Sequence, residues 1–242
     1  MPRVNIAMPT YGSSVRSELM RSFYPLMTGG GIAGCSFAFS EMDYSDIEVS
    51  RNYLLSNFYY NKKDCTHLLM VDSDMGFGLD MVRDMIAFDK PVVGALSPRR
   101  SIDLRKLHAN AGLPYERALA RSIEFVGAIR EPRSISGSFI RMEACGAGIL
   151  LITRACVDRM IECLPDIVDE TGFKTYAFAH RFERFLTPFD KIRARTGQIS
   201  EDFAFCRRWV DGCDGEIWAC HDRKISHVGS LTVTASYSDR GK

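Results

Sequence analysis

The segment Leu68–Phe77, with the sequence LLMVDSDMGF, decides the fold class of this chain. It continues an apolar run over His67–Val71, and a short apolar run bounded by turn-forming residues is typical of a buried strand. Asp72 and Asp74 follow the run directly. Side chains two apart on an extended segment point the same way, so the sequence predicts two carboxylates on one side at the carboxyl end of a central strand.

Strands and helices alternate around this segment. Val4–Met8 and Pro91–Leu96 are further apolar runs that predict strands. Apolar residues at helical spacing predict a helix over residues 45–58 and another over residues 81–86. Because strands joined by helices need crossover connections, this order predicts a parallel or mostly parallel sheet covered on both faces.

The second part of the chain has a different pattern. Ile123–Ile129 and Ser138–Met142 predict strands with no helix between them, which favours an antiparallel arrangement. The pattern then predicts a strand over Gly146–Ile152, a helix over Thr153–Cys163, a long loop over residues 167–198, a helix capped by Ser200, and strands over Glu216–Cys220 and Lys224–Val228. A glycine-rich loop is expected at residues 28–34.

These patterns predict one α/β domain over residues 1–242. Its core would be a Rossmann-like, mostly parallel sheet flanked by helices, with a mixed or antiparallel C-terminal part. Residues 1–98 form the expected nucleotide-binding half, and residues 99–242 form the mixed half.

Charge and hydropathy exclude some classes of protein. Thirty-one Lys and Arg residues against 30 Asp and Glu residues give a net charge of +1, so whole-molecule charge does not favour nucleic acid or a membrane surface as partner. No apolar run approaches the roughly 18 to 20 residues that a membrane-spanning helix needs. The N-terminal residues lack the plan of a signal peptide, and we expect a cytoplasmic location.

The eight cysteines predict buried thiols rather than a disulfide framework or a zinc site. The chain has no CxxC pair, although Cys206, Cys213, Cys220 and His227 recur every seven residues. Structural zinc sites usually take ligands in closely spaced pairs, which disfavours zinc here.

Three groups of residues could carry chemistry. Asp72 and Asp74 suit a hard divalent cation, although they could also cap the following helix. A phosphatase of the haloacid dehalogenase type also has two such aspartates, but this class is disfavoured because Gly76 replaces its usual threonine. Glu201 and Asp202 lie in a predicted first helical turn, where the helix dipole alone favours acids, but one of them could be a general base, Asp202 before Glu201.

His227 is the third candidate, on a strand-like segment that ends at a glycine. It could be an ordinary packed or surface histidine. If it joined Asp72 and Asp74 at one cation, the mixed nitrogen and oxygen ligands would favour Mn²⁺ over Mg²⁺.

In their order along the chain, these motifs resemble those of a GT-A-fold glycosyltransferase, nucleotide-sugar-dependent, DxD-containing and family-2-like. The resemblance runs from about residue 3 to residue 230 and is carried by Pro9-Thr10-Tyr11, Ser50-Arg51-Asn52, Asp72-Ser73-Asp74, Gly146-Ala147-Gly148, Glu201-Asp202 and His227.

The resemblance implies a metal-dependent transfer of a sugar from a nucleotide-diphosphate sugar to an acceptor hydroxyl. It implies that about residues 1–98 form the nucleotide-sugar-binding half and about residues 99–242 the acceptor-binding half. It implies that Pro9, Thr10 and Tyr11 contact the nucleoside and that Arg51 lies near the ribose or diphosphate. Asp72, Ser73 and Asp74 would bind the donor, and Asp72, Asp74 and His227 would hold Mn²⁺ or Mg²⁺. Asp202 would activate the acceptor. This describes an inverting enzyme, while a retaining enzyme would not need that base.

Two other functions stay open. A nucleotidyltransferase on a similar scaffold would carry a Gly-rich, basic loop after its first strand, where this chain has Pro9-Thr10-Tyr11-Gly12. A non-catalytic nucleotide-sugar-binding or scaffold protein would keep the fold without turnover.

The acceptor is not defined by the sequence. Between Arg99 and Arg141 there are nine Lys or Arg residues and four acids, an excess that could attract a phosphate-bearing acceptor or could be a solvated face. A glycan, a lipid-linked sugar, a protein and a modified nucleic acid all remain candidates. The aromatic segment within residues 167–198 could close over donor and acceptor, or could be core packing.

Overall fold

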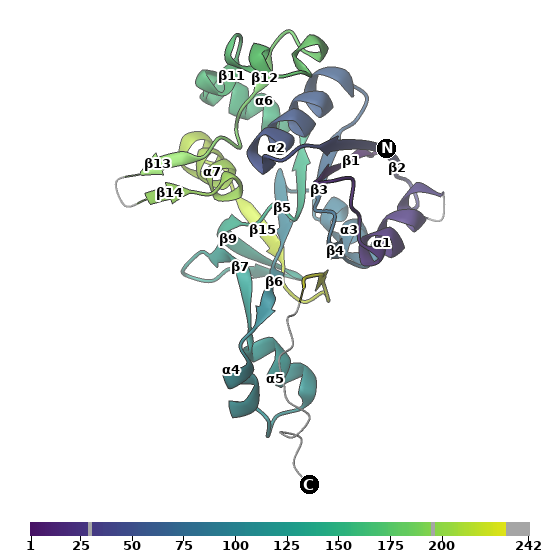
Figure 1. The fold of residues 1–242 in the computed structure, drawn as a ribbon, viewed down its shortest axis with the longest axis vertical. Helices are drawn as coiled ribbons and strands as arrows, with labels where there is room; N and C mark the ends of the chain where they lie inside the picture. Colours follow the sequence, from purple (N-terminus) through teal and green to yellow (C-terminus); the bar gives the residue numbers. More distant parts are fainter. Residues whose placement is uncertain (29–30, 195–196, 231–242) are drawn as a thin grey trace.

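The structure, a computed structural model, describes residues 1–28, 31–194 and 197–230. Its centre is a mixed sheet with the strand order β2-β1-β3-β10-β5-β15-β9-β7-β6, in which β8 pairs with β9 (Figure 1). The strands of this sheet are β1 Arg3–Thr10, β2 Ser36–Asp43, β3 His67–Val71, β5 Val92–Ala95, β6 Ser97–Ile102, β7 Ile123–Ile129, β8 Ile135–Ser136, β9 Phe139–Cys145, β10 Ile149–Thr153 and β15 Ile217–Cys220.

Strand directions change across the sheet. β1 pairs in parallel with β2 and β3, and β15 pairs in parallel with β5. β10 lies between β3 and β5 and is antiparallel to both. From β15 through β9, β7 and β6 every pairing is antiparallel. The predicted α/β class and the antiparallel C-terminal part are therefore confirmed.

Helices cover both faces of the sheet, as predicted. They are α1 Ser17–Met27, α2 Ile47–Ser56, α3 Leu79–Ala87, α4 Leu104–Ala109, α5 Tyr115–Arg121, α6 Arg154–Cys163 and α7 Glu201–Arg207. The buried residues of α2, α6 and α7 share one core cluster, and those of α1 and α3 share the other. Along β3, Leu68 and Met70 contribute to the first cluster while Leu69 and Val71 contribute to the second, which is the alternation of a strand buried on both faces.

Helix α2 is the most deeply enclosed helix near the sheet edge. Its N-cap is Asp46, whose side chain accepts a hydrogen bond from the Glu48 N–H at 2.9 Å, so the predicted start of this helix is confirmed. Every residue from Val49 to Ser56 is buried. Asn52 fixes the chain that covers it, because its amide accepts from the Phe189 N–H at 2.9 Å and donates to Asp190 at 2.7 Å.

The segment expected as a long loop is largely packed and contains short elements. These are β11 Val168–Asp169, β12 Phe185–Leu186, β13 Ile192–Ala194, β14 Gly197–Ile199 and 3-10 turns at Pro165–Ile167, Gly172–Thr175 and Ala179–Arg181. Phe173, Phe185 and Phe189 are fully buried, and the Phe189 ring stacks on Phe205 of α7. Core packing therefore accounts for these aromatic side chains. Residues 195–196 of this segment, and residues 29–30 of the expected 28–34 loop, lie outside the described residues.

Several predicted boundaries were wrong. The strand predicted over Gly146–Ile152 begins at Ile149, because residues 146–148 form the turn that leads from β9 to β10. β1 continues through Pro9, where it pairs only with β2, so the missing N–H of proline costs no ladder bond on the other side. The helices α1, α4 and α5 and the strand β2 were not predicted at all.

The remaining elements include π-helical turns at Asn57–Asn61 and Arg208–Gly212 and the short strands β4 Met75–Gly76 and β16 Ser226–His227. All eight cysteines, each within the described ranges, are free thiols, and six of them are buried, as predicted. In the described part of the chain, no helix combines the length and apolar character needed to span a membrane.

Candidate functional site

The predicted site residues lie at the edge of the sheet where β1, β3 and β5 end. The Asp72 N–H donates to the carbonyl of Gly148 at 2.9 Å, which joins the end of β3 to the start of β10. β16 pairs with β4, so His227 lies opposite Met75, and the Val228 N–H donates to the Asp74 carbonyl at 2.9 Å. A two-residue pairing thus brings the late histidine to the DxD segment.

Arg51 of α2 joins two of the carboxylates. Its Nη2 donates to Asp72 Oδ1 at 3.1 Å, and its Nε lies 3.7 Å from Glu201 Oε1. Arg51 is only 4% exposed. Its Nε and Nη1 have no hydrogen-bond partner among the described residues, which is uncommon for a buried guanidinium.

Glu201 is held in an unusual electrostatic environment. Burial raises the pKa of its carboxyl above the ordinary value; the Arg51 charge lowers that pKa, and the charges of Asp202 and Asp72 raise it. The net effect is a raised pKa, because desolvation outweighs the pairing with Arg51. A carboxyl group with a raised pKa is a stronger base when ionised, which is a property that acid–base chemistry uses.

Asp74 lies in a second group with His227 and Arg100. Arg100 Nη1 of β6 donates to Asp74 Oδ2 at 2.9 Å, and His227 Nε2 lies 3.5 Å from Asp74 Oδ1. The other ring nitrogen, Nδ1, lies 2.7 Å from the Pro98 carbonyl oxygen, so it must carry a proton to make this hydrogen bond. The carbonyl of Pro98 therefore fixes the ring and turns Nε2 toward Asp74.

These contacts shift both pKa values in the Asp74 and His227 pair. Burial alone would raise the pKa of Asp74, but the hydrogen bond and charge of His227, with the charge of Arg100, bring it below the ordinary value. The hydrogen bond to Asp74 raises the pKa of His227 against the opposing effect of burial. Each of the two residues therefore stabilises the charged form of the other.

Asp202 is fixed through one carboxylate oxygen. Its Oδ1 accepts from the Phe203 N–H at 2.8 Å and from the Ser200 hydroxyl. Ser200 is at the predicted N-cap, but its hydroxyl donates to Asp202 and makes no capping bond to the helix, so that part of the prediction was wrong. The remaining oxygen, Oδ2, faces Gly146, where an added methyl group would lie 3.6 Å away.

The turn of residues 146–148 passes close to two carboxylates. A methyl group added at Gly148 would lie 3.1 Å from Asp72 Oδ2, closer than most real contacts allow. Gly146 has the corresponding position beside Asp202. Because glycine has no side chain, the backbone can lie against both carboxylates, and no Cβ covers Asp72 Oδ2 or Asp202 Oδ2.

Thr10 at the end of β1 and the residues that follow it form a separate part of the edge. The Thr10 hydroxyl donates to Glu41 of β2 at 3.0 Å, and the N–H groups of Gly12 and Ser13 donate to Asp43 at 3.0 and 2.9 Å. Tyr11 is 74% exposed, so its ring is free to contact a planar group.

The structure brings the predicted residues together in two groups rather than one. Asp72 lies with Arg51 and Glu201, while Asp74 lies with His227 and Arg100. Within the described ranges, no three His, Cys, Asp or Glu side chains gather closely enough to hold a metal ion, so Asp72, Asp74 and His227 are not assembled as three ligands. Ser73 takes part through its carbonyl, which accepts from the Arg16 N–H at 2.9 Å.

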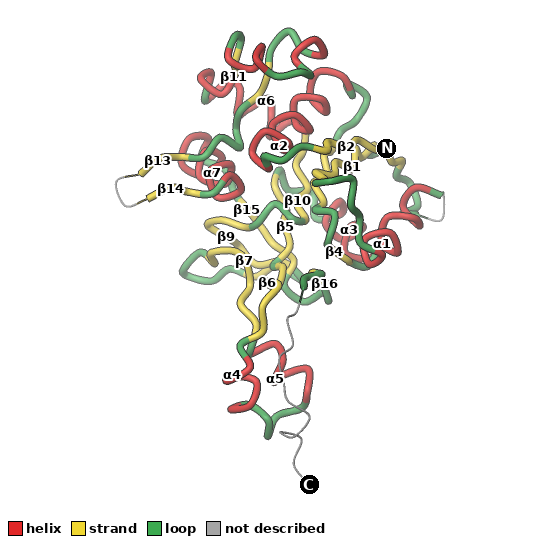
Figure 2. The backbone as a smooth tube through the Cα atoms, viewed as in Figure 1, coloured by secondary structure: helices red, strands yellow, loops and turns green. Residues whose placement is uncertain are grey.

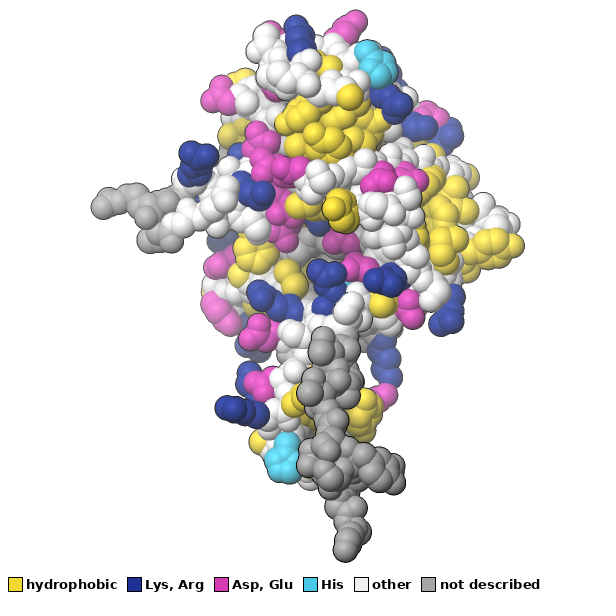
Figure 3. All heavy atoms as spheres, viewed as in Figure 1, with side chains coloured by type: hydrophobic (Ala, Val, Ile, Leu, Met, Phe, Trp, Pro, Cys, Tyr) yellow, Lys and Arg dark blue, Asp and Glu magenta, His cyan; other side chains and the backbone are white. Residues whose placement is uncertain are grey.

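The site has an excess of negative charge. The four carboxylates of Asp72, Asp74, Glu201 and Asp202 face the two guanidinium groups of Arg51 and Arg100, which leaves a charge of −2 when His227 is neutral. Figure 3 shows acidic side chains gathered toward the middle of this face, beside α2 and α7. Such a site favours a divalent cation over a bare anion.

Sequence reasoning missed Arg100, Glu41 and Asp43. Arg100 was one of nine basic residues in the tract from Arg99 to Arg141, and nothing in its spacing distinguished it. Glu41 and Asp43 lie on β2, a strand that the sequence pattern did not reveal. Their roles depend on contacts between distant segments.

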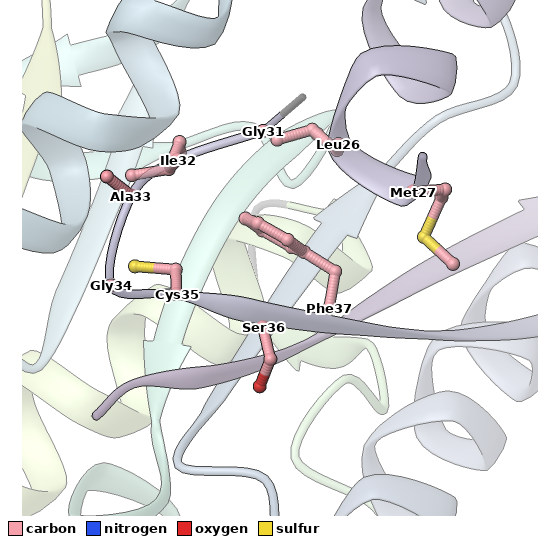
Figure 4. A pocket seen from close by; sticks show the side chains of 9 residues that line it. All are labelled: Leu26, Met27, Gly31, Ile32, Ala33, Gly34, Cys35, Ser36 and Phe37. Carbon is pink, nitrogen blue, oxygen red and sulfur yellow. The ribbon is translucent and has the colours of Figure 1, made fainter. Parts of the chain in front are cut away.

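The cavity in Figure 4 is separate from these groups. It has a volume of about 530 Å³ and lies between the end of α1 and β2, with the ring of Phe37 directed into it. None of its nine described lining residues is charged. It therefore offers no ion pair to a phosphate or a metal.

The sheet and the charged edge define an α/β protein whose candidate site lies at the carboxyl ends of strands, where open α/β sheets bind ligands. No protein-family model matches the chain, and no curated protein matches it. Among solved structures, A197 from STIV has a TM-score of 0.47 and 14% identity, with 98% of this chain and 99% of that chain covered. A glycosyltransferase involved in the glycosylation of the major capsid of PBCV-1 has a TM-score of 0.32 and 10% identity, over 75% and 76% of the two chains. At these values neither likeness indicates a shared function.

Proposed function

We propose that this protein transfers a sugar from a nucleotide-diphosphate sugar to an acceptor hydroxyl with the help of a divalent cation. The observation that carries the proposal is the convergence of Asp74, His227 and Arg100 with Arg51, Asp72, Glu201 and Asp202 at one sheet edge. Such an edge supplies acidic ligands for a cation, basic groups for phosphate and carboxylates for proton transfer.

Asp74 and His227 fit a cation site. Because His227 Nδ1 donates to the Pro98 carbonyl, the neutral ring keeps a lone pair on Nε2, 3.5 Å from Asp74 Oδ1. Metal-binding histidines are usually oriented in this way by a partner on the other ring nitrogen. A carboxylate oxygen and an imidazole nitrogen favour Mn²⁺, and water and substrate phosphate complete such sites.

The cation, when bound, would neutralise the charge that grows on the departing nucleoside diphosphate. We propose Asp74 and His227 as its protein ligands, with water and substrate phosphate in the remaining positions, while Asp72 stays paired with Arg51. Arg100 is 57% exposed at its side chain, and we propose that it contacts the diphosphate when a cation takes its place at Asp74.

Arg51 acts differently in this proposal. Since it is 4% exposed, it has little surface to offer a donor, and its contacts run to Asp72 and Glu201. We assign it a positioning role: it holds the side chain of Asp72 at the end of β3. Tyr11, which is exposed at the end of β1, is the proposed contact for the nucleoside base.

Asp202 is the proposed general base. The bonds from Phe203 N–H and Ser200 fix its Oδ1, and this leaves Oδ2 beside Gly146 to accept the proton of the acceptor hydroxyl. Glu201, one residue earlier, is the alternative base, because its pKa is raised. A base at this place describes an inverting transfer.

A thermal-shift screen tests the proposal. UDP-, GDP-, CMP- and dTDP-sugars are added with Mn²⁺, Mg²⁺ or EDTA, because a ligand that binds only the folded state raises the melting temperature. We expect a rise with one nucleotide family that EDTA abolishes. Asp74→Asn should remove the rise, and Asp166→Asn, at an exposed aspartate away from the edge, should keep it.

Two outcomes would decide against the proposal. An absence of any shift with all donors would contradict the donor site. A metal-dependent shift without release of nucleoside diphosphate, with candidate acceptors present, would favour a binding protein without turnover.

A further inference from the structure

An arm of residues 97–129 projects from the end of the sheet. It consists of β6, α4, α5 and β7, and Figures 1 and 2 show its two short helices standing apart from the rest of the molecule. Between residues 101 and 121, a stretch that the structure describes throughout, Ala118 is the only buried residue. The tip of the arm thus lacks a core of its own.

The apolar residues of the tip face outward. Leu104 is 65% exposed and Tyr115 is 72% exposed. The two helices border a groove of about 460 Å³, lined by Leu104, Leu107, His108, Ala111, Leu113, Tyr115 and Ala118. Leu104, Leu107 and Ala111 lie at positions i, i+3 and i+7 along α4 and its end, and together they make a stripe that is apolar except for His108 at i+4.

Such helices need a covering surface. α4 has six residues and α5 has seven, lengths at which a helix is marginal in water unless its apolar face is packed. α4 buries no residue at all. The exposed stripe therefore indicates an external partner.

The arm that carries the stripe is rich in basic residues. Residues 99–121 contain six Lys or Arg residues and two acids. Lys106 pairs with Asp103 at 3.8 Å, and Arg99 pairs with Glu124 at 3.7 Å. In the part of the chain that the structure describes, Arg105, Arg117 and Arg121 pair with no acid.

We infer that this tip docks on an anionic lipid surface. Leu104 and Tyr115 would enter the boundary between headgroups and acyl chains, while Arg105, Arg117 and Arg121 would contact the phosphates. An anionic membrane satisfies both features at once, whereas an apolar protein surface would leave the arginines without partners and a nucleic acid would leave Leu104 in water.

The base of the arm belongs to the candidate site. The carbonyl of Pro98 in β6 accepts a hydrogen bond from His227 Nδ1, and Arg100 of β6 donates to Asp74. Docking of the tip would therefore hold the carboxylate edge near the lipid surface, within reach of an acceptor carried by a lipid. The docking itself does not depend on sugar transfer.

Vesicle sedimentation of the full chain tests the inference. We expect binding to vesicles of equal parts phosphatidylcholine and phosphatidylglycerol, and little binding to phosphatidylcholine alone. Leu104→Ser with Tyr115→Ser should weaken binding roughly tenfold or more. Replacing Arg105, Arg117 and Arg121 by Gln should weaken it by about fivefold per residue and remove its salt dependence.

A matched control separates the arm from exposed apolar surface in general. Met20→Ser with Tyr24→Ser changes two residues of α1 that are 45% and 64% exposed, and it should bind vesicles like the wild type. Circular dichroism and the melting temperature without added ligand check that each variant is folded.

Three results would overturn the inference. The first is wild-type protein that stays in the supernatant with anionic vesicles. The second is an arm variant that binds as tightly as the wild type. The third is a wild-type dimer that Leu104→Ser with Tyr115→Ser dissociates, which would assign the stripe to a second copy of this chain. Since sedimentation needs no donor, its failure is distinguishable from a failure of the proposed transfer.

Discussion

Arg51 holds Asp72 through one nitrogen, with Nη2 at 3.1 Å from Oδ1, and its buried Nη1 has no partner among the described residues. A guanidinium can make two parallel bonds to a carboxylate, but here a single nitrogen contacts both oxygens of Asp72, at 3.1 and 3.3 Å. The second carboxylate, Glu201, lies beside Nε. Arg51 therefore balances two acids that would otherwise repel each other.

Loss of Arg51 should destabilise the fold. Arg51→Met leaves Asp72 and Glu201 without their cation in a partly buried place, and we expect a cost of about 3 kcal/mol, at the low end for a broken buried pair because Asp72 keeps some exposure. Urea unfolding measures it. Arg83→Met, at an exposed arginine of α3, should change stability by less than about 0.5 kcal/mol. Equal effects in both variants would contradict the role of Arg51.

Glu201 should make stability depend on pH. Its folded pKa is raised, so its contribution to stability is present below the ordinary glutamate pKa and is lost as pH rises through the folded value. Arg51 of α2, Asp72 after β3 and Asp202 of the same helix face this group. Glu201→Gln should therefore melt higher than the wild type near pH 7.5, and the difference should vanish near pH 4. A lower melting temperature at both pH values would contradict the raised pKa.

Arg100 should compete with metal for Asp74. Arg100→Gln removes a partly exposed ion pair, so Mn²⁺ should bind about fivefold more tightly, as expected for a pair worth about 1 kcal/mol. Titration calorimetry with Mn²⁺ alone measures this. Arg99→Gln, which removes a neighbouring pair with Glu124, should leave Mn²⁺ affinity unchanged. Unchanged or weaker binding in Arg100→Gln would show that Arg100 does not occupy the cation position.

Asp202→Asn should separate binding from transfer. The amide keeps the shape of the side chain but cannot take a proton, so donor-induced thermal shifts should persist while nucleoside diphosphate release falls roughly a hundredfold or more. Glu201→Gln serves as the comparison. If Glu201→Gln loses transfer and Asp202→Asn keeps it, the base is Glu201.

Gly215 should tolerate no side chain. A methyl group there would overlap the indole of Trp209, which is 3% exposed and donates from Nε1 to the Glu216 carbonyl at 3.0 Å. We expect Gly215→Ala to cost about 2 kcal/mol through overpacking. Gly112→Ala, where no atom lies within 4 Å of the added carbon, is the control. A melting temperature unchanged in Gly215→Ala would show that the indole can move.

Elements with strong local patterns could be predicted from the sequence. β3, β5 and α6 were predicted within a residue or two, because their apolar runs and stripes face a core directly. α1 was not predicted, although its buried residues Leu19, Ser22 and Leu26 fall at helical spacing, because Pro25 and the glycines that follow it favour a loop. α4 and α5 span only six and seven residues, so a helical period does not stand out from the neighbouring loops.

The shared position of the candidate residues at one sheet edge could be predicted from the sequence, but their pairing could not. Asp72 and Asp74 follow β3, Glu201 and Asp202 begin α7, and the pairing of β16 with β4 brings His227 to the same edge. Which acid pairs with which base depends on how closely α2 and β6 approach the end of β3. That approach is a property of packing, and no spacing in the sequence carries it.

The position of β10 sets the order in which this sheet can form. β3 and β5 are close in sequence, but they do not pair with each other. The strand that lies between them and pairs with both is β10, which begins only at Ile149. During synthesis the first hundred residues therefore emerge with two hydrophobic strands that lack a shared neighbour. Loop closure over this distance is slow, and such strands are vulnerable to aggregation while they wait. The exposed edges of β3 and β5 should thus need protection at least until residue 153, the end of β10, has left the ribosome.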